Sequence, residues 1–328
     1  MDPASQAKRL HVPTYEEVLR RIKTRYPHNV GTFERERLSL ELTRNVVISK
    51  TEPVVELWRL VRGLHPFYAR LLETAFDLKQ IEEDFRCVMK ARRVAEEMWG
   101  KYRYVLLGAE TEAEARRIGR EGRGRMLSQL KKCSRSLERL KEVAKFLSGL
   151  PAIDTSLPIV IVAGPPNAGK STFVATVSSA KPEIAPYPFT TKNVIIGHVQ
   201  LGDAVVQVVD TPGLLDRDPA EMNEVERRAV AALRELPGPV VFLVDPTPLA
   251  ALSVQEQLRL LDRVRGWLGE RPVLVAINKV DAAGEDAIRS VEGAVRAKEL
   301  KVVRLVAYKK ELAMEVLRSA LEGLRSSP

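Results

Sequence analysis

Cysteine is scarce in this chain, and long apolar runs are missing. Among 328 residues the only cysteines are Cys87 and Cys133, which lie far apart in the sequence. This scarcity rules out a disulfide scaffold and a cysteine zinc site, and it fits the reducing cytosol. No apolar run approaches the roughly 20 residues that span a bilayer, and the first residues lack the apolar core of a secretion signal. We therefore expect a cytoplasmic protein without a membrane partner.

Acidic residues balance basic ones in only one half of the chain. Residues 1–150 contain 31 Lys and Arg against 21 Asp and Glu, whereas residues 151–328 contain 21 against 22. A basic excess on one side favours a polyanionic partner such as nucleic acid. Hydrophobic residues make up 45% of the chain and charged residues 29%, which is typical of globular domains and excludes a disordered chain.

The first half of the chain has the spacing of helices. Long helices are expected at about 67–108 and 110–149, and a linker rich in Gly and Pro follows at 147–158. We therefore predict an all-α helical bundle over residues 1–150 and a second domain over 151–328. Within the second long helix, apolar residues step alternately by four and three, which indicates helix packing against helix. This seam consists of Met126, Leu130, Cys133, Leu137, Leu140, Ala144 and Leu147.

The second half predicts an α/β fold. Six short β-branched runs alternate with helical segments, at 158–164, 193–201, 204–211, 238–246, 271–279 and 301–308. Such alternation indicates βαβ units and a mostly parallel six-stranded sheet. Only Gly202 and Asp203 separate the second run from the third. Because this gap is too short for a crossover, the pair is predicted to form one antiparallel hairpin.

A phosphate-binding loop follows the first of these runs. Residues 164–171 read GPPNAGKS and match the pattern G-x-x-x-x-G-K-[ST] between a strand and a helix,. The loop N–H groups and the helix start would hold an anion. Lys170 would neutralise the β- and γ-phosphates, and Ser171 would ligate Mg²⁺. The predicted nucleotide contacts here are Gly164, Pro165, Asn167, Ala168, Gly169, Lys170, Ser171 and Thr172.

Two further motifs end later runs. Asp210 of the segment DTPG can hold Mg²⁺, and the N–H of Gly213 can meet the γ-phosphate,. In the segment NKVD, the carboxylate of Asp281 can accept two hydrogen bonds from guanine. Adenine lacks both donors and would leave that carboxylate unpaired. Asn278 would fix the loop and the stem of Lys279 would cover the base, so the three motifs together predict GTP or GDP as the ligand.

At this point the sequence resembles P-loop GTPases of the translation-factor class. The segment APYPFTTKNVIIGHV (185–199) is similar to the first switch of the Obg-like branch, where Y-x-F-T-T is characteristic. By this resemblance Thr191, rather than Thr190, is the threonine that senses Mg²⁺ and the γ-phosphate. The predicted metal ligands are therefore Ser171, Thr191 and Asp210.

The resemblance is closer to the nucleolar GTP-binding protein 1 family, including its archaeal members. It extends beyond the GTPase motifs to VPTYEEVL (12–19), LHPFYARLL (64–72) and LERLKEVAKFLSGLPAID (137–154). It implies a GTPase of large-ribosomal-subunit assembly whose helical bundle docks on ribosomal RNA, and which is nucleolar in eukaryotic relatives. We expect a monomer. The last guanine loop departs from the usual S-A and reads Val306-Ala307, where the Ala307 N–H would bind the guanine O6.

The hydrolytic machinery is incomplete by sequence. Ras-like enzymes place a water-orienting Gln after the glycine of the second motif, whereas this chain has Leu214. Slow intrinsic turnover is expected, with catalytic contributions from Asn167, Lys170, Thr191 and Gly213. Either K⁺ bound by Asn167 or the ribosome acting in trans would complete the site; alternatively, Asn167 merely braces the loop. The second switch also contains five acidic residues, one of which could be a catalytic carboxylate. Alternatively, they form a solvated acidic face at the start of a helix. These residues are Asp216, Asp218, Glu221, Glu224 and Glu226.

A basic stretch predicts the RNA contact. Residues 116–141 hold ten Lys and Arg but only two Glu. Because the seam occupies the apolar face, the basic side chains are expected to project outward to phosphates, with Gly122 and Gly124 allowing close approach. An ordinary charged helix surface is the alternative. The predicted RNA contacts are Arg116, Arg117, Arg120, Arg123, Arg125, Lys131, Lys132, Arg135 and Arg139.

Two classes of function are compatible with these features. The first is an assembly GTPase whose nucleotide state controls docking on the large-subunit precursor. The second is a GTP-sensing binding module with little hydrolysis of its own, acting on another anionic partner such as transfer RNA or a membrane surface. Leu214 keeps the second class open, and the absence of a lipidation signal weighs against its membrane form,.

Overall fold

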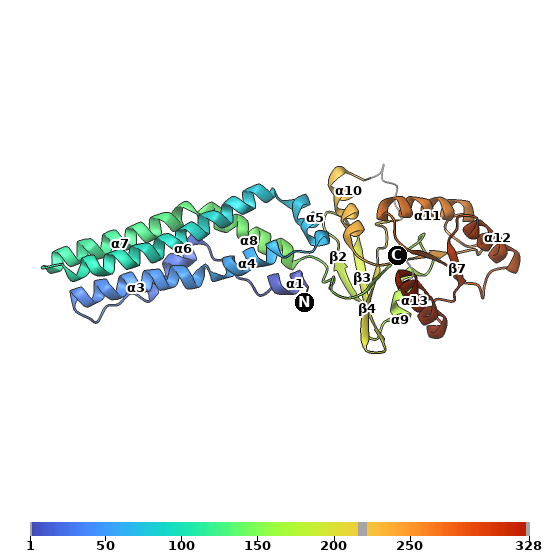
Figure 1. The fold of residues 1–328 in the computed structure, drawn as a ribbon, viewed down its shortest axis with the longest axis horizontal. Helices are drawn as coiled ribbons and strands as arrows, with labels where there is room; N and C mark the ends of the chain where they lie inside the picture. The colour runs from blue at the N-terminus through green and yellow to red at the C-terminus, as the bar shows by residue number, and fades with distance from the viewer. Residues whose placement is uncertain (1, 216–221, 326–328) are drawn as a thin grey trace. The chain divides into compact units, whose positions relative to one another are not determined.

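The computed structural model describes residues 2–215 and 222–325, and they form two compact units (Figure 1). The helical unit comprises residues 3–64 and 75–149. The sheet unit comprises residues 65–74 and the described residues from 150 onward, together with Asp2. The chain therefore leaves the helical unit once, at residue 65, and returns to it at residue 75, before it crosses finally near the predicted linker. The boundary that we predict at residue 150 does not foresee this excursion.

The helical unit is built on three long helices that pack side by side: α3 (Thr32–Lys50), α6 (Leu78–Leu107) and α7 (Glu112–Lys132). Helix α8 (Ser134–Ser148) packs against α6 and against the short N-terminal helix. The shorter helices are α1 (Pro3–Ala7), α2 (Tyr15–Thr24) and α4 (Glu52–Arg62). Side-chain caps fix two of the starts, because Thr14 accepts a hydrogen bond from the Glu17 N–H and Thr111 accepts one from the Glu114 N–H,.

Both long helices predicted from the sequence are interrupted. The first divides into α5 (Pro66–Ala75) and α6, because Asp77 accepts a hydrogen bond from the Lys79 N–H and starts a new helix,. The second divides at Cys133, whose backbone φ of −90° and ψ of 10° lie just outside the helical range. The apolar seam nevertheless continues through this break, and all seven of its residues are buried. A small deviation at one residue preserves the phase of the two helices.

The two cysteines form a disulfide bond, which runs against the fit to a reducing cytosol that we expected from their scarcity. Cys87 of α6 is joined to Cys133 between α7 and α8, across a sequence separation of 46 residues. Cys133 is fully buried, so its predicted place in the seam is correct, but its bond to Cys87 is not foreseen by the sequence. Sequence distance misled us because antiparallel packing of long helices brings remote positions together.

The sheet unit has seven strands in the order β2-β3-β4-β1-β5-β6-β7. They are β1 (Ile159–Ala163), β2 (Glu183–Pro186), β3 (Asn193–Leu201), β4 (Ala204–Asp210), β5 (Val240–Val244), β6 (Val273–Ile277) and β7 (Lys301–Arg304). Strand β1 pairs in parallel with β4 and β5, and β6 and β7 continue the parallel part. The predicted two-residue hairpin is confirmed, because β3 and β4 are antiparallel and pair Leu201 with Ala204.

Strand β2 is the element that the sequence did not predict. Its four residues, EIAP, pair antiparallel with β3 at the edge of the sheet. Only Ala185 is buried, and Ile184 is largely exposed. A strand with one buried side chain and a terminal proline lacks the alternation by which strands are identified.

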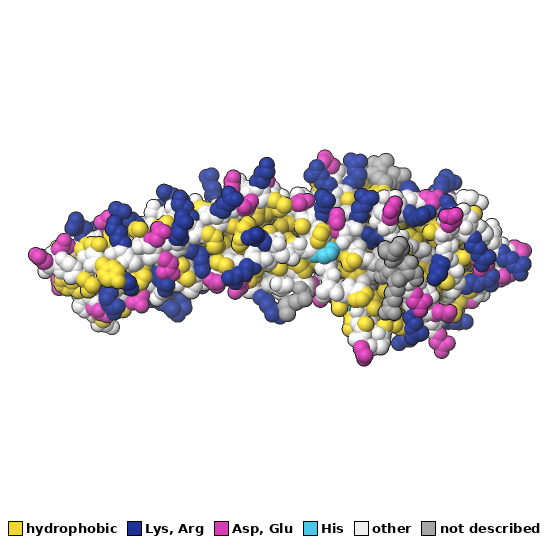
Figure 2. Space-filling view, viewed as in Figure 1, with side chains coloured by type: hydrophobic (Ala, Val, Ile, Leu, Met, Phe, Trp, Pro, Cys, Tyr) yellow, Lys and Arg dark blue, Asp and Glu magenta, His cyan; other side chains and the backbone are white. Residues whose placement is uncertain are grey.

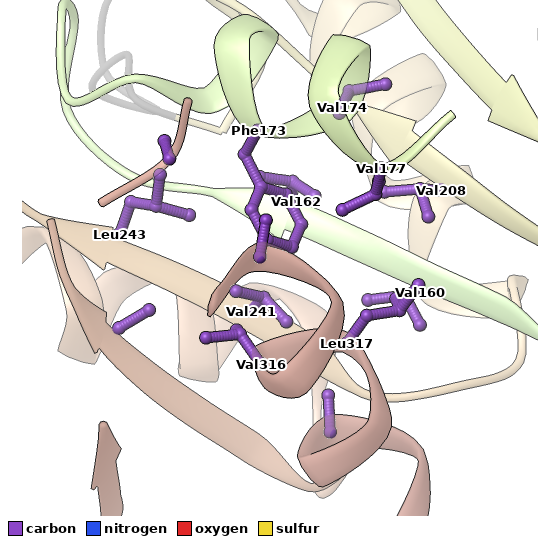
Figure 3. Packing of buried hydrophobic residues seen from close by; sticks show 14 of the residues in the cluster. Val160, Val162, Phe173, Val174, Val177, Val208, Val241, Leu243, Val316 and Leu317 are labelled. Atoms are coloured by element: carbon purple, nitrogen blue, oxygen red, sulfur yellow. The ribbon is translucent and has the colours of Figure 1, made fainter. Parts of the chain in front are cut away.

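Helices cover both faces of the sheet. Helices α9 (Lys170–Val177) and α13 (Lys310–Arg325) pack on one face, and α10 (Glu224–Ala231), α11 (Val254–Leu268) and α12 (Glu285–Arg296) lie over the other. A short 3₁₀ helix spans Ala232–Glu235. Alternate residues of β1 and β5, such as Val160 and Val241, meet Phe173 and Leu317 in one buried cluster (Figure 3). This core fixes β1 and α9, and therefore the loop between them.

Helix α5 belongs to the sheet unit through a buried tyrosine. The Tyr68 hydroxyl accepts a hydrogen bond from the Ile153 N–H at 2.9 Å and lies within 2.8 Å of the carbonyls of Pro151 and Ile153. Burial raises the pKa of Tyr68 well above its usual value, so the hydroxyl stays a donor at any pH at which the chain is folded. The segment that leads into β1 is thereby attached to α5.

Candidate nucleotide-binding site

The loop between β1 and α9 can be made only with glycine at two positions. Gly164 has φ of 142°, and a side-chain carbon there would lie 2.5 Å from the carbonyl oxygen of Leu243. Gly169 has φ of 96°, and a side-chain carbon there would lie 2.3 Å from the Asn278 side chain. Other residues rarely adopt such φ values. The loop is therefore pressed between β5 and the loop after β6.

Lys170 lies across this loop at the start of α9. It is buried, and its ammonium group donates hydrogen bonds to the carbonyls of Gly164 at 2.7 Å and Pro165 at 2.8 Å. A buried cation within a loop at a helix N-terminus is an arrangement that binds phosphate. Asn167, with φ of 62°, and Pro166 are the exposed tip of the loop.

The residues expected to hold Mg²⁺ meet beside the loop. The Ser171 hydroxyl donates a hydrogen bond to the Asp210 carboxylate at 2.9 Å, where β4 ends. Next to it, the Thr211 hydroxyl is buried and has no hydrogen-bond partner among the described residues. Hydroxyl and carboxylate oxygens are the ligands that Mg²⁺ prefers. This donor set fits the ion, which would be held by Ser171 and Asp210 and would neutralise phosphate charge.

The first switch is a closed turn in which the two threonines differ. The Thr190 hydroxyl donates to the carbonyl of Tyr187 at 3.0 Å and accepts from the Lys192 N–H at 3.2 Å. Thr191 is exposed and lines the phosphate pocket. Tyr187 is fully buried, and its hydroxyl donates to the carbonyl of Ala229 in α10 at 2.7 Å. The turn therefore engages Thr190 and leaves Thr191 facing the pocket.

These loops line a pocket of about 880 Å³. Gly213, with φ of 71°, lies in it, and a side-chain carbon there would come within 2.8 Å of the Lys192 side chain. Leu214 is only 1% exposed and points away into the core. The pocket is lined by Pro166, Asn167, Gly169, Lys170, Ser171, Thr172, Ile184, Thr191, Lys192, Asn193, Ile195, Pro212 and Gly213.

A second pocket of about 300 Å³ adjoins the first and contains the residues predicted to bind the base. Asn278 connects its walls, because its amide donates to the carbonyl of Ala168 at 2.7 Å and its amide oxygen accepts from the Ala307 N–H at 2.9 Å. Gly169 and Thr172 are shared with the first pocket. The other lining residues are Lys279, Asp281, Ala282, Val306, Ala307 and Tyr308.

Two side chains that the sequence did not point to hold the base pocket in shape. The Lys279 ammonium pairs with the buried Asp245 carboxylate at 2.5 Å, at the end of β5. The Asp281 carboxylate accepts a hydrogen bond from the Tyr308 hydroxyl. The Ala307 N–H, which we expected to bind guanine, is engaged by Asn278 instead. Asp245 directly follows β5, much as Asp210 ends β4, and this position at a strand end is the signal that could have identified it. Lys192 of the phosphate pocket and Tyr308 of the base pocket could have been identified because each is adjacent in the sequence to a predicted site residue.

The acidic residues predicted for the second switch fall into two groups. Asp216, Asp218 and Glu221 lie outside the described residues. Glu224 and Glu226 are in the first turn of α10, where the Asn223 side chain and Glu226 form a capping box. Carboxylates in this position stabilise a helix start, which accounts for these two residues without a catalytic role.

The predicted RNA residues do not all project outward. Arg123 is only 18% exposed and donates to Glu36 at 2.5 Å and to Ser39, so it joins α7 to α3. Arg139 pairs with the buried carboxylate of Asp84. The prediction that Arg123 faces solvent is wrong. Arg139 is exposed as predicted, but like Arg123 it neutralises a buried acid on another helix,.

The other seven basic residues are exposed, in two groups. Arg116, Arg117 and Arg125 each pair with a Glu three or four residues earlier on α7. Four make no ion pair with any described residue: Arg120, Lys131, Lys132 and Arg135.

The two glycines that we predicted to allow close approach also differ. A side-chain carbon on Gly122 would lie 2.6 Å from Leu40, so this glycine permits helix packing rather than approach to RNA. The corresponding position on Gly124 has no atom within 4 Å. Only Gly124 therefore remains available for the predicted close approach.

Comparison with known proteins agrees with both units. Residues 8–154 match the family described as the NOG1 N-terminal helical domain, and residues 159–279 match the family described as 50S ribosome-binding GTPase. None of the described helices combines the length and apolar character that a bilayer crossing demands.

Three relatives carry the same name, nucleolar GTP-binding protein 1. That of Caenorhabditis elegans is 32% identical over 74% of this chain and 36% of its own length. Those of Kluyveromyces lactis and Encephalitozoon cuniculi are 26% and 34% identical, over 88% and 68% of this chain and 46% and 42% of their own lengths. The chain thus spans less than half the length of these relatives. It is a member of the nucleolar GTP-binding protein 1 family and joins that family's N-terminal helical domain to a GTPase domain.

Proposed function

We propose that this chain is a GTP-binding and GTP-hydrolysing switch in large-ribosomal-subunit assembly, and that its helical unit docks on ribosomal RNA. The nucleotide part rests on Asn278, which connects the phosphate loop at Ala168 to the base loop at Ala307. The phosphate-binding and base-binding residues therefore line adjoining pockets, as one bound nucleotide requires. The ribosomal part is supported by the family description as a 50S ribosome-binding GTPase and by the nucleolar names of the relatives.

Different residues would recognise the phosphates, the metal ion and the base. Lys170 and the loop N–H groups would bind the phosphates, while Ser171, Asp210 and Thr191 would hold Mg²⁺, which would supply positive charge against the phosphate oxygens. The Asp281 carboxylate selects guanine because adenine offers it no donor. Thr191 and the Gly213 N–H respond to the γ-phosphate, so both switch segments order differently with GTP and GDP.

Intrinsic hydrolysis is expected to be slow. Leu214 is buried and apolar, so the position that orients water in Ras-like enzymes provides no polar atom,. An outside group must then complete the site. A ribosomal activator in trans is one source of this group. GTP turnover that rises only when ribosomal particles are added would support it.

The second source is K⁺, held by Asn167. This side chain is exposed at the tip of the phosphate loop and lines the phosphate pocket, so its amide oxygen can reach a cation beside the β- and γ-phosphates. Turnover should be faster in K⁺ than in Na⁺, and Asn167→Ala should remove the difference while GDP affinity is retained. Equal turnover of the unaltered protein in the two salts would refute this role.

The RNA-docking face is the outer side of α7 and the start of α8. Arg117, Arg120, Lys131 and Arg135 recur at multiples of about 3.6 residues, and Gly124 lies among them,. All five are exposed, and the last three cations have no acidic partner among the described residues. Cations without an acidic partner can bind RNA phosphates and release their counterions, because no ion pair within the protein has to break first. Figure 2 shows dark blue side chains recurring along the helical unit.

The test is co-sedimentation with large ribosomal subunits in the presence of GDP or a non-hydrolysable GTP analogue. We expect binding that is stronger with the GTP analogue. Reversing Arg120, Lys131, Lys132 and Arg135 to Glu should abolish it without changing GDP affinity. A matched control reverses four exposed lysines elsewhere in the helical unit, Lys23, Lys79, Lys90 and Lys101. If both quadruple variants lose binding equally, net charge and not this face is responsible.

The same experiment distinguishes the alternative function. A GTP-sensing module with little hydrolysis would bind another anionic partner, such as transfer RNA, through the same cations. Binding to ribosomal particles that is absent, or indifferent to the nucleotide, would favour this alternative. GDP binding would then still stand, because it depends on the sheet unit alone.

A further inference from the structure

Tyr308 places a hydroxyl at the group that recognises guanine. It follows Ala307 in the loop before α13, and its hydroxyl donates a hydrogen bond to Oδ2 of Asp281 across the base pocket. The ring is 63% exposed. Asp281 makes no ion pair with any described residue, and the nearby Lys279 ammonium is held by Asp245. The Tyr308 hydroxyl is therefore a hydrogen-bond donor to the Asp281 carboxylate in the structure.

Guanine and tyrosine compete for the same acceptor. Guanine needs both oxygens of the Asp281 carboxylate, one for its N1–H and one for its 2-amino group. Hypoxanthine has only the N1–H and needs one oxygen, so the other can keep its bond to Tyr308. The hydrogen bond to Asp281 raises the pKa of Tyr308 above its ordinary value, so the hydroxyl remains a donor at neutral pH.

We infer that Tyr308 is a specificity-determining residue of the base pocket, whose hydroxyl competes with guanine for the Asp281 carboxylate. This inference rests on the proposed binding of guanine nucleotides. Guanine makes one of its two contacts at the oxygen that already accepts from Tyr308, so this oxygen is shared between two donors, whereas hypoxanthine can leave it to Tyr308,. The tyrosine hydroxyl therefore weakens guanine binding and narrows the preference for guanine over hypoxanthine.

The test compares GDP and IDP binding to the full chain and to Tyr308→Phe. Phenylalanine retains the ring and removes only the competing hydroxyl. A hydrogen bond to a charged group is stronger than a neutral one, but exposure to solvent weakens it, so GDP should bind roughly three- to tenfold more tightly. IDP affinity should stay within about twofold or fall, because hypoxanthine loses the hydroxyl that completes its site. The GDP-to-IDP preference therefore rises.

The control is Tyr104→Phe in the helical unit. Tyr104 is also 63% exposed, and its hydroxyl accepts a hydrogen bond from Arg103. This variant should leave both affinities unchanged. If Tyr308→Phe leaves GDP affinity unchanged, weakens it, or shifts GDP and IDP equally, the inference is overturned. If the unaltered chain binds neither nucleotide, the proposed function fails as well, so the two failures are distinguishable.

Discussion

Buried polar side chains serve different ends in the two units. In the sheet unit, Lys170, Asp210, Asp245 and Asn278 lie in segments that follow the carboxyl ends of strands, and three of them contact other site loops. This edge of a parallel sheet is where ligands bind. In the helical unit, buried polar residues recur at steps of four, three and four along α3: Thr32, Glu36, Ser39 and Thr43.

That helical row faces another helix rather than a ligand. Arg123 of α7 donates to Glu36 and Ser39, and Thr43 donates to the carbonyl of Ser39. Gly119 makes room, because a side-chain carbon there would lie 2.1 Å from Glu36. Such groups fix which helix positions meet, since any other register would leave them unpaired. Polar burial at strand ends thus marks a site, whereas polar burial at helical spacing marks an interface. Four substitutions or treatments test this distinction.

The largest effect is expected from the Cys87–Cys133 disulfide. Reducing it should lower the free energy of unfolding of the helical unit by about 4 kcal/mol, because the bond restrains a long loop in the unfolded chain,. The measurement is urea unfolding with and without reductant in a Trp267→Phe background, where Trp58 and Trp99 report the helical unit alone. The double variant Cys87→Ala, Cys133→Ala should not respond to reductant. Two titratable thiols in the unreduced, unfolded protein would contradict the bond.

Lys170→Ala should disable the phosphate loop. Its ammonium would bind phosphate through charge-assisted hydrogen bonds, and the loss of about 3 kcal/mol corresponds to a roughly hundredfold weaker GDP affinity. Titration with a fluorescent GDP measures this change. The unfolding of the helical unit should be unaltered. Lys310→Ala, an exposed lysine at the start of α13, is the matched control and should bind GDP normally.

In contrast to Lys170→Ala, Glu36→Gln should alter the stability of the helical unit and leave GDP affinity unchanged. Removing one charge of the largely buried Glu36–Arg123 pair is expected to destabilise the helical unit by about 2 kcal/mol, since Arg123 is left without its counter-charge in a partly exposed setting,. GDP affinity should not change. Glu41→Gln removes an exposed partner of Arg37 and should cost less than about 0.5 kcal/mol,. Equal costs for the two variants would mean that burial of the row is energetically unimportant.

The smallest effects should separate two glycines of one helix. Gly122→Ala is expected to destabilise the helical unit by about 1–2 kcal/mol, because the added carbon meets Leu40 at 2.6 Å and Tyr102 at 2.8 Å,. Gly124→Ala meets nothing and should stabilise it by up to about 1 kcal/mol through helix propensity,. Thermal unfolding of the two variants should therefore shift in opposite directions. Stabilisation by both would show that α7 does not pack closely at Gly122.

Much of the sheet unit could be predicted from the sequence, because its signals are local. The phosphate loop, the six runs and the two-residue hairpin each depend on neighbouring residues,. The helical unit was harder, because its decisive contacts join distant positions. Nothing near Arg123 or Arg139 indicates that Glu36 or Asp84 will lie opposite it, and nothing near Cys87 indicates Cys133. Charge alone led us to expect nine outward cations in a stretch where Arg123 is largely buried and where Arg123 and Arg139 pair with acids of other helices.

The buried ring of Tyr187 has a consequence for how the first switch transmits a signal. The hydroxyl is bonded to the Ala229 carbonyl of α10, and the N–H of the same residue is bonded to the Lys192 carbonyl. Burial raises the pKa of this tyrosine well above its usual value, so the attachment does not loosen with pH. The loop is therefore anchored to α10 at Tyr187. If Thr191 responds to the γ-phosphate as proposed, a displacement of this turn would reach α10 through the bond of Tyr187 to Ala229.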